Sequence, residues 1–117
     1  MRTVRELVDT KTHRLLSINP EHSVYDALHK MAEHDVGALI VLKEQALVGI
    51  FSERDYARKI VLDGRTSKST PVSDVMTSKV VCVSPDRTAD ECMALMTEKR
   101  VRHLPVIDQK KVLAVVS

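Results

Sequence analysis

Aromatic residues, glycine and cysteine are scarce in this chain of 117 residues. One Phe, two Tyr and no Trp leave too few rings to stack the bases of a single-stranded nucleic acid. The three glycines form no glycine-rich phosphate loop of the nucleotide-hydrolase kind. The two cysteines, Cys82 and Cys92, are too few for a disulfide framework, so we expect packed, reduced thiols in a cytoplasmic protein.

Long apolar runs and an excess of one charge sign are also absent. The longest apolar stretches, such as residues 37–42, are too short to span a bilayer, and the mixed charge of residues 1–6 is not that of a secretory signal. Eighteen Lys and Arg face sixteen Asp and Glu, for a net charge of +2. That balance argues against nucleic-acid or membrane binding through bulk charge.

Catalytic and metal-binding patterns are missing as well. The five histidines include no His-Glu-x-x-His, and His29 and His34 are five residues apart, off one helical face. Ser52 has no base nearby in sequence to activate it as a nucleophile. We therefore expect a protein that is not an enzyme and that requires neither a metal nor a cofactor.

The chain contains an internal sequence repeat. Shifted by 65 residues, residues 15–52 align without a gap with residues 80–117. Seven aligned positions are identical, among them Pro20 with Pro85 and Met31 with Met96. In both copies, apolar residues occur at the i, i+3, i+4, i+7 spacing of a helix with one apolar face. These residues are Val24, Ala27, Leu28 and Met31 in the first copy, and Ala89, Cys92, Met93 and Met96 in the second.

Both predicted helices begin with the same start signal, a hydroxyl residue three positions before a carboxylate. Ser23 precedes Asp26, and Thr88 precedes Glu91, the spacing of a helix N-cap. Each helix is followed by two β-rich runs joined by a short polar connection, which predicts a hairpin. The expected strands are residues 38–42, 46–51, 104–107 and 112–116.

The expected fold class is α/β (α+β), with each repeat running strand, helix, strand, strand, helix. A closing helix is predicted over residues 52–61, and the polar stretch 63–70 is the expected linker. We divide the chain into a first motif with its lead-in, residues 1–65, and a second motif, residues 66–117. The second motif stops before its closing helix, so we expect it to expose an apolar face.

Two strings carry a resemblance to a known family. Residues 49–55, Gly-Ile-Phe-Ser-Glu-Arg-Asp, fit a Gly-x-x-Thr/Ser-x-x-Asp ligand motif, and residues 102–108, Arg-His-Leu-Pro-Val-Ile-Asp, fit a basic pair before Leu-Pro-Val. Residues 71–76 are similar to the lead-in of a second motif. With its repeat, the chain resembles a tandem cystathionine-β-synthase (CBS) domain pair over residues 3–117. The resemblance implies two repeats related by pseudo-twofold symmetry, in a stand-alone protein that forms a homodimer.

Ser52 and Asp55 allow two interpretations from the residues alone. Ser52 is a natural cap for the helix that begins after it, with Asp55 completing a capping box. An ionised Asp55 also offers acceptor oxygens for the two hydroxyls of a ribose. The CBS resemblance implies the ribose role for Asp55. Arg54 is a cation on a first helical turn, where the helix dipole disfavours it, so we expect either a phosphate contact or a solvated surface residue.

The resemblance implies a cleft between the two copies for an adenosine-containing regulator: AMP, ADP, ATP, NAD or S-adenosylmethionine. In that cleft we expect Asp55 to be joined by the basic turn of the other copy and by the strand that begins it. Backbone groups of the apolar strand residues are expected to read the adenine edge, with their side chains on its face. The expected ligand-binding residues are Ser52, Arg54, Asp55, Lys79, Val80, Val81, Arg102, His103, Leu104 and Pro105.

A second, weaker site is expected in the mirror-related position. It has no basic pair, because Gly37 and Ala38 stand where the other copy has Arg102 and His103, and the Asp expected three residues after Ser117 lies beyond the end of the sequence. The residues expected there are His13, Arg14, Leu15, Val36, Gly37, Ala38 and Ser117.

Two alternatives to a ligand-binding regulator stay open. The repeat is also consistent with a structural dimerisation module in which Ser52 and Asp55 only cap a helix. The other alternative, which the low net charge disfavours, is nucleic-acid binding through Arg54, Arg58, Lys59 and Arg102. If the chain is a regulator, it acts on its own oligomer or on a protein effector in trans.

Overall fold

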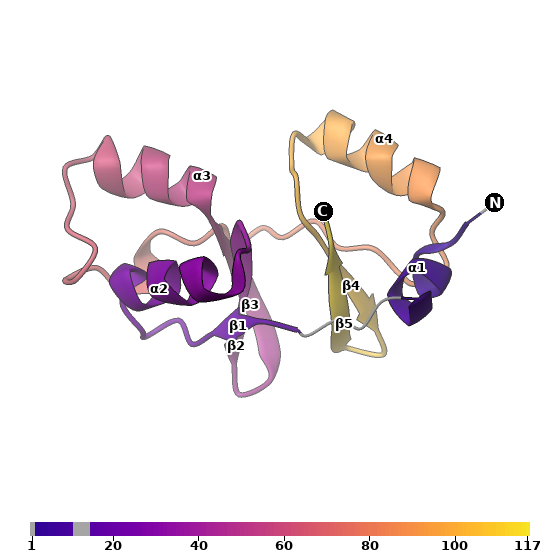
Figure 1. The fold of residues 1–117 in the computed structure, drawn as a ribbon, viewed down its shortest axis with the longest axis horizontal. Helices are drawn as coiled ribbons and strands as arrows, with labels where there is room; N and C mark the ends of the chain where they lie inside the picture. The colour runs from indigo at the N-terminus through magenta and orange to yellow at the C-terminus, as the bar shows by residue number, and fades with distance from the viewer. Residues whose placement is uncertain (1, 11–14) are drawn as a thin grey trace. The chain divides into compact units, whose positions relative to one another are not determined.

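The computed structural model describes residues 2–10 and 15–117 and shows mixed helix and strand content, which confirms the predicted fold class (Figure 1). The elements in chain order are α1 (Val4–Thr10), β1 (Ser17–Ile18), α2 (Val24–His34), β2 (Ala38–Lys43), β3 (Ala46–Ser52), α3 (Glu53–Tyr56), the π-helical turn η1 (Ala57–Val61), the 3₁₀ turn η2 (Val72–Asp74), α4 (Ala89–Lys99), β4 (Leu104–Asp108) and β5 (Lys111–Val116). None of the helices in this described part is long and apolar enough to cross a membrane.

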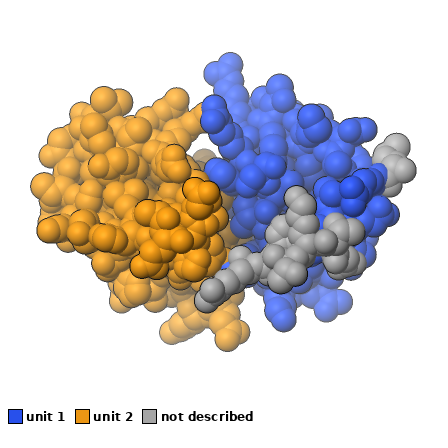
Figure 2. All heavy atoms as spheres, in the orientation of Figure 1, with its two compact units in different colours: residues 1–15, 80–117 blue, residues 16–79 orange. Residues whose placement is uncertain are grey.

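The chain forms two compact units, coloured separately in Figure 2. The first-repeat unit comprises residues 16–79, and the second-repeat unit comprises residues 1–15 and 80–117. This division in space differs from the sequence division into residues 1–65 and 66–117. The lead-in that precedes each repeat in sequence packs in the unit of the other repeat.

Matching hydrogen bonds explain that exchange of lead-ins. The backbone N–H of Val4 donates to the carbonyl of Arg87, and that of Val72 donates to the carbonyl of His22, both at 2.8 Å. The two acceptors are equivalent residues of the repeats. Val4 and Val72 are both fully buried, each in the core of the unit that receives it.

The strands repeat with the same register. In the first-repeat unit β1 pairs parallel with β2, with Ile18 opposite Val41. In the second-repeat unit Val83 forms a parallel bridge with Val106, which is the same pairing shifted by 65 residues. The antiparallel ladders β2–β3 and β4–β5 are both irregular just after these positions. The internal repeat predicted from sequence is therefore present in the backbone.

The predicted helix starts and hairpins are confirmed. The Ser23 hydroxyl accepts from the backbone N–H of Asp26 at 3.1 Å, and Thr88 forms a reciprocal capping box with Glu91. In each hairpin two adjacent turn residues have positive φ, the conformation whose twist suits a two-residue connection. Those residues are Glu44 and Gln45, and Gln109 and Lys110.

The closing helix of the first repeat begins where predicted but is α-helical only over its first turn. From Ala57 onward it widens into the π-helical turn η1, in which Leu62 N–H donates to the carbonyl of Ala57 at 3.2 Å. Ile60, only 2% exposed, is its core residue. Propensity and spacing do not distinguish a π turn from an α turn, so the sequence predicted only the helix.

Each unit has its own hydrophobic core. The helices α2 and α3 lie beside the same three-stranded sheet (Figure 1), and the buried residues of this first core are Ile18, Val24, Ala27, Met31, Leu39, Val41, Phe51, Ile60, Val72 and Val75. The second core contains Val4, Val83, Cys92, Leu104 and Val106. The apolar stripe of α4 is incompletely covered, because Met93 is 66% exposed.

Candidate functional site

The junction of β3 and α3 positions Asp55. The strand ends at Ser52, whose extended backbone caps the helix. The Ser52 hydroxyl accepts from the Asp55 N–H at 3.3 Å, while the Asp55 Oδ2 accepts from the Ser52 N–H at 3.0 Å. A further bond, at 3.1 Å, joins the Ser52 hydroxyl to the same Oδ2. The capping-box interpretation of this pair is therefore confirmed.

The other carboxylate oxygen of Asp55 contacts two residues that the sequence analysis did not place in the ligand site. Thr77 Oγ1 donates to Oδ1 at 3.0 Å, and Lys59 Nζ lies 2.9 Å from the same oxygen. The Lys59 ammonium also donates to the carbonyl of Val75 at 2.9 Å. Lys59 was detectable as an i+4 partner of Asp55, but no local signal points to Thr77.

Residues predicted for the weaker site adjoin the Ser52 cap. Ala38 pairs with Ser52 across the β2–β3 ladder, and the carbonyl of Gly37 accepts from Glu53 N–H at 3.0 Å. Val36 packs against the first core. The first-repeat unit therefore brings Val36, Gly37 and Ala38 together with Ser52, a residue predicted for the other site. Arg54 is exposed on the first turn of α3.

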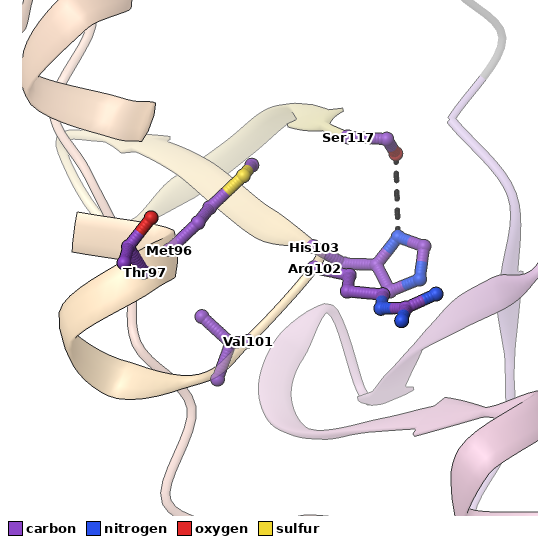
Figure 3. A pocket seen from close by; sticks show the side chains of 6 residues that line it. All are labelled: Met96, Thr97, Val101, Arg102, His103 and Ser117. Carbon is purple, nitrogen blue, oxygen red and sulfur yellow. Dashed lines mark hydrogen bonds between the residues drawn. The ribbon is translucent and has the colours of Figure 1, made fainter. Parts of the chain in front are cut away.

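In the second-repeat unit, Arg102, His103 and Ser117 line one pocket with a volume of about 510 Å³. Figure 3 shows the two basic side chains next to each other, with the His103 ring turned to Ser117. His103 Nδ1 and Ser117 Oγ are 3.2 Å apart and share a hydrogen bond. The remaining lining residues are Met96, Thr97 and Val101.

In the first repeat, the residues equivalent to the apolar wall of this pocket are covered by the closing helix. The counterparts of Met96 and Val101 are Met31 and Val36, which belong to one core cluster with Ile60 of η1. Met31 is accordingly buried, whereas Met96 is half-buried. The pocket therefore combines a basic, polar rim with an apolar wall that a closing helix covers in the first repeat.

The other predicted site residues divide between surface and core. Lys79 is exposed, and Val80, Val81 and Leu15 are half-buried. Leu104 and Pro105 are buried, and the carbonyl of Pro105 already accepts from Val83 N–H at 3.0 Å. The Leu104 side chain, which was expected on an adenine face, packs in the second core. His13 and Arg14 lie outside the described residues.

The described residues Cys82, Cys92 and Glu91 have displaced pKa values. Burial raises the pKa of the Cys82 and Cys92 thiols, so both are poor nucleophiles at neutral pH. The Thr88 N–H that Glu91 accepts lowers the pKa of that carboxyl. The α4 capping box is therefore complete above the ordinary Glu pKa and is lost as pH falls through the lowered value. Within the described ranges, His, Cys, Asp and Glu form no group of three that could hold a metal ion.

Comparison with known proteins identifies the family. The model for the CBS domain matches residues 4–62 and 72–117. The chain belongs to the CBS-domain family. Tandem CBS pairs are generally regulatory, ligand-binding modules, often of small adenosine ligands, and they often oligomerise. Stand-alone CBS-domain proteins are generally regulatory rather than catalytic.

Three relatives illustrate the similarity. The mitochondrial CBS domain-containing protein CBSX3 of Arabidopsis thaliana is 49% identical over 102 residues, which is 83% of this chain and 50% of that protein. A crystal structure of a CBS domain is 46% identical with a TM-score of 0.95, over 99% of this chain and 91% of the other. A hexameric CBS-CP12 protein from bloom-forming cyanobacteria is 27% identical with a TM-score of 0.84, over 94% and 62%. The chain thus spans about half the length of the Arabidopsis relative.

Proposed function

We propose that this CBS pair is a regulatory module that binds an adenosine-containing ligand through the carboxylate of Asp55. The observation that carries the proposal is the placement of that carboxylate. It is 6% exposed and held at a strand–helix junction by a cap, within a string that matches the family's ligand motif. A fixed carboxylate is suited to two adjacent sugar hydroxyls, because a carboxylate oxygen has two lone-pair positions and can accept from both.

The basic turn of the second repeat favours a phosphorylated ligand. The pocket that contains Arg102 and His103 has two nitrogen-rich side chains next to each other, and guanidinium groups pair with phosphate by charge-assisted hydrogen bonds. AMP, ADP, ATP and NAD fit this chemistry, and S-adenosylmethionine shares only the adenosine part. We assign the sugar to Asp55 and the phosphate to Arg102 and His103.

Regulation would operate by linkage. A ligand that binds one conformation better than another shifts the population toward it and changes the surface that a partner contacts. We propose a homodimer as the working assembly, acting on itself or on a protein effector in trans. A cytoplasmic location remains our proposal from composition, while the Arabidopsis relative is named as mitochondrial.

Thermal or urea unfolding with and without AMP, ATP and NAD tests the proposal. A ligand at about one hundred times its dissociation constant is expected to stabilise the protein by about 2.7 kcal/mol. The midpoint should rise with ligand concentration for at least one of the three. If no adenosine ligand shifts the midpoint, the result favours a structural dimerisation module. Affinity for nucleic acid that falls steeply with salt and survives Asp55→Ala would instead support nucleic-acid binding.

Replacing the basic side chain of the pocket separates phosphate from nucleoside recognition. Arg102→Ala is expected to weaken AMP or ATP binding about tenfold and adenosine binding much less, because the guanidinium contributes a charge-assisted hydrogen bond to phosphate. Calorimetric titration of each ligand measures the difference. Lys99→Ala, which removes an exposed cation from the last turn of α4, is the control. Equal losses for adenosine and AMP would remove Arg102 from phosphate recognition.

A further inference from the structure

The carboxylate of Asp55 is already fully bonded within its own chain. Its Oδ2 accepts from the backbone and the hydroxyl of Ser52, and its Oδ1 accepts from Thr77 and Lys59. An ionised carboxylate has about four lone-pair positions, so these four donors leave none open. A ligand that bonds to Asp55 has to displace some of them.

Displacing the donors to Asp55 Oδ2 would cost more free energy than displacing the donors to Oδ1. The bonds to Oδ2 form the capping box, and breaking them would leave orphan N–H groups at the start of α3. The bonds to Oδ1 come from a hydroxyl and from an ammonium whose side chain is 40% exposed, so water can replace Asp55 as the partner of Lys59. Entry of a sugar diol therefore opens the Oδ1 side.

Both donors to Asp55 Oδ1 belong to or contact residues 75–77, the segment that follows η2. Thr77 belongs to it and pairs with Ile50 of β3 through two backbone hydrogen bonds of 2.8 and 2.9 Å. Lys59 bridges Asp55 to the carbonyl of Val75. The side chains of Thr77 and Lys59 thus connect residues 75–77 to the proposed sugar position, and backbone hydrogen bonds connect this segment to the sheet.

We infer that Lys59 and Thr77 form a latch on Asp55, which an adenosine ligand opens, so that occupancy of the site loosens the pairing of residues 75–77 with β3. The inference rests on the proposed function and adds its means of transmission. Residues 75–77 precede the second repeat in sequence, so their release changes the segment that joins the repeats. Lys59 and Thr77 are positioning residues that act through Asp55.

Adenosine is the probe for the latch because it carries no phosphate. Lys59→Met and Thr77→Val each remove one donor, and we expect each variant to bind adenosine about fivefold more tightly than the unmodified protein. Without ligand, the amides of Ile50 and Thr77 should exchange with solvent about fivefold faster in both variants. In the unmodified protein, saturating adenosine should speed exchange at these two amides relative to the rest of β3.

Matched variants separate the latch from general effects. Arg58→Met removes an exposed cation next to Lys59, Ser78→Ala removes an exposed hydroxyl next to Thr77, and Thr77→Ser keeps the donor. All three are expected to behave like the unmodified protein. If Lys59→Met does not fold, the comparison of Thr77→Val with Thr77→Ser decides the outcome. Adenosine binding by the unmodified protein with equal or weaker binding by the latch variants overturns the latch alone. No adenosine binding by any of them overturns the proposed function and the latch together.

Discussion

Gly49→Val is expected to destabilise the protein by about 3 kcal/mol, because overpacking of a filled site forces its neighbours apart. A Cβ at position 49 would lie 2.6 Å from Met76 Sδ and 2.9 Å from the backbone oxygen of Thr77. The Met76 side chain can rotate away, but the carbonyl of Thr77 is hydrogen-bonded to Ile50. The absence of a side chain at Gly49 therefore allows residues 76 and 77 to pack on β3.

Urea unfolding measures the loss, and amide exchange locates it. We expect Gly49→Ala to show a smaller loss than Gly49→Val, with faster exchange at Thr77 in both. Ala46→Val, at an exposed position at the start of β3, is the control and should be nearly neutral. Unchanged unfolding midpoints and unchanged Thr77 exchange in both glycine variants would show that residues 76 and 77 do not pack closely on Gly49.

Asp55→Ala is expected to weaken adenosine binding at least about tenfold and to lower stability by about 2 kcal/mol. The binding loss follows from removal of the acceptor for the sugar. The stability loss follows from the ligand-free contacts, because the variant lacks one half of the capping box and leaves Thr77 Oγ1 and Lys59 Nζ without their acceptor. The four bonds predict a folded but weakened protein.

Calorimetric titration and urea unfolding measure the two effects separately. Glu53→Ala, which removes an exposed carboxylate from the same turn of α3, should leave both quantities close to those of the unmodified protein. A variant that loses stability but keeps its adenosine affinity would restrict Asp55 to the capping role.

Local features of the fold could be predicted from the sequence. The caps at Ser23 and Thr88 depend on residues three positions apart, and the hairpins depend on adjacent turn residues, so each signal lies within a short window. The repeat reinforced these signals because each appeared twice in the same register. The helices α2 and α4, the start of α3, the strands β2 to β5 and the fold class followed from them, whereas α1 was not predicted.

Features that depend on distant residues could not be predicted. Val4 lies just before the first repeat but packs with the second, and Val72 lies just before the second repeat but packs with the first. No periodicity within the lead-ins indicates this exchange. Thr77 lies 22 positions from Asp55, so its contact with the carboxylate appears only once the segment after η2 pairs with β3. The burial of the Leu104 side chain in the second core also follows from tertiary packing, which its motif does not indicate.

The sugar-diol role of Asp55 is tested most directly by comparing adenosine with 2′,3′-dideoxyadenosine, which lacks both hydroxyls. Dissociation constants of the two nucleosides are measured for the unmodified protein and for Asp55→Ala. We predict that the unmodified protein binds adenosine at least about tenfold more tightly than the dideoxy compound, and that the ratio falls close to one in Asp55→Ala. Equal affinity of the unmodified protein for the two nucleosides would contradict the account.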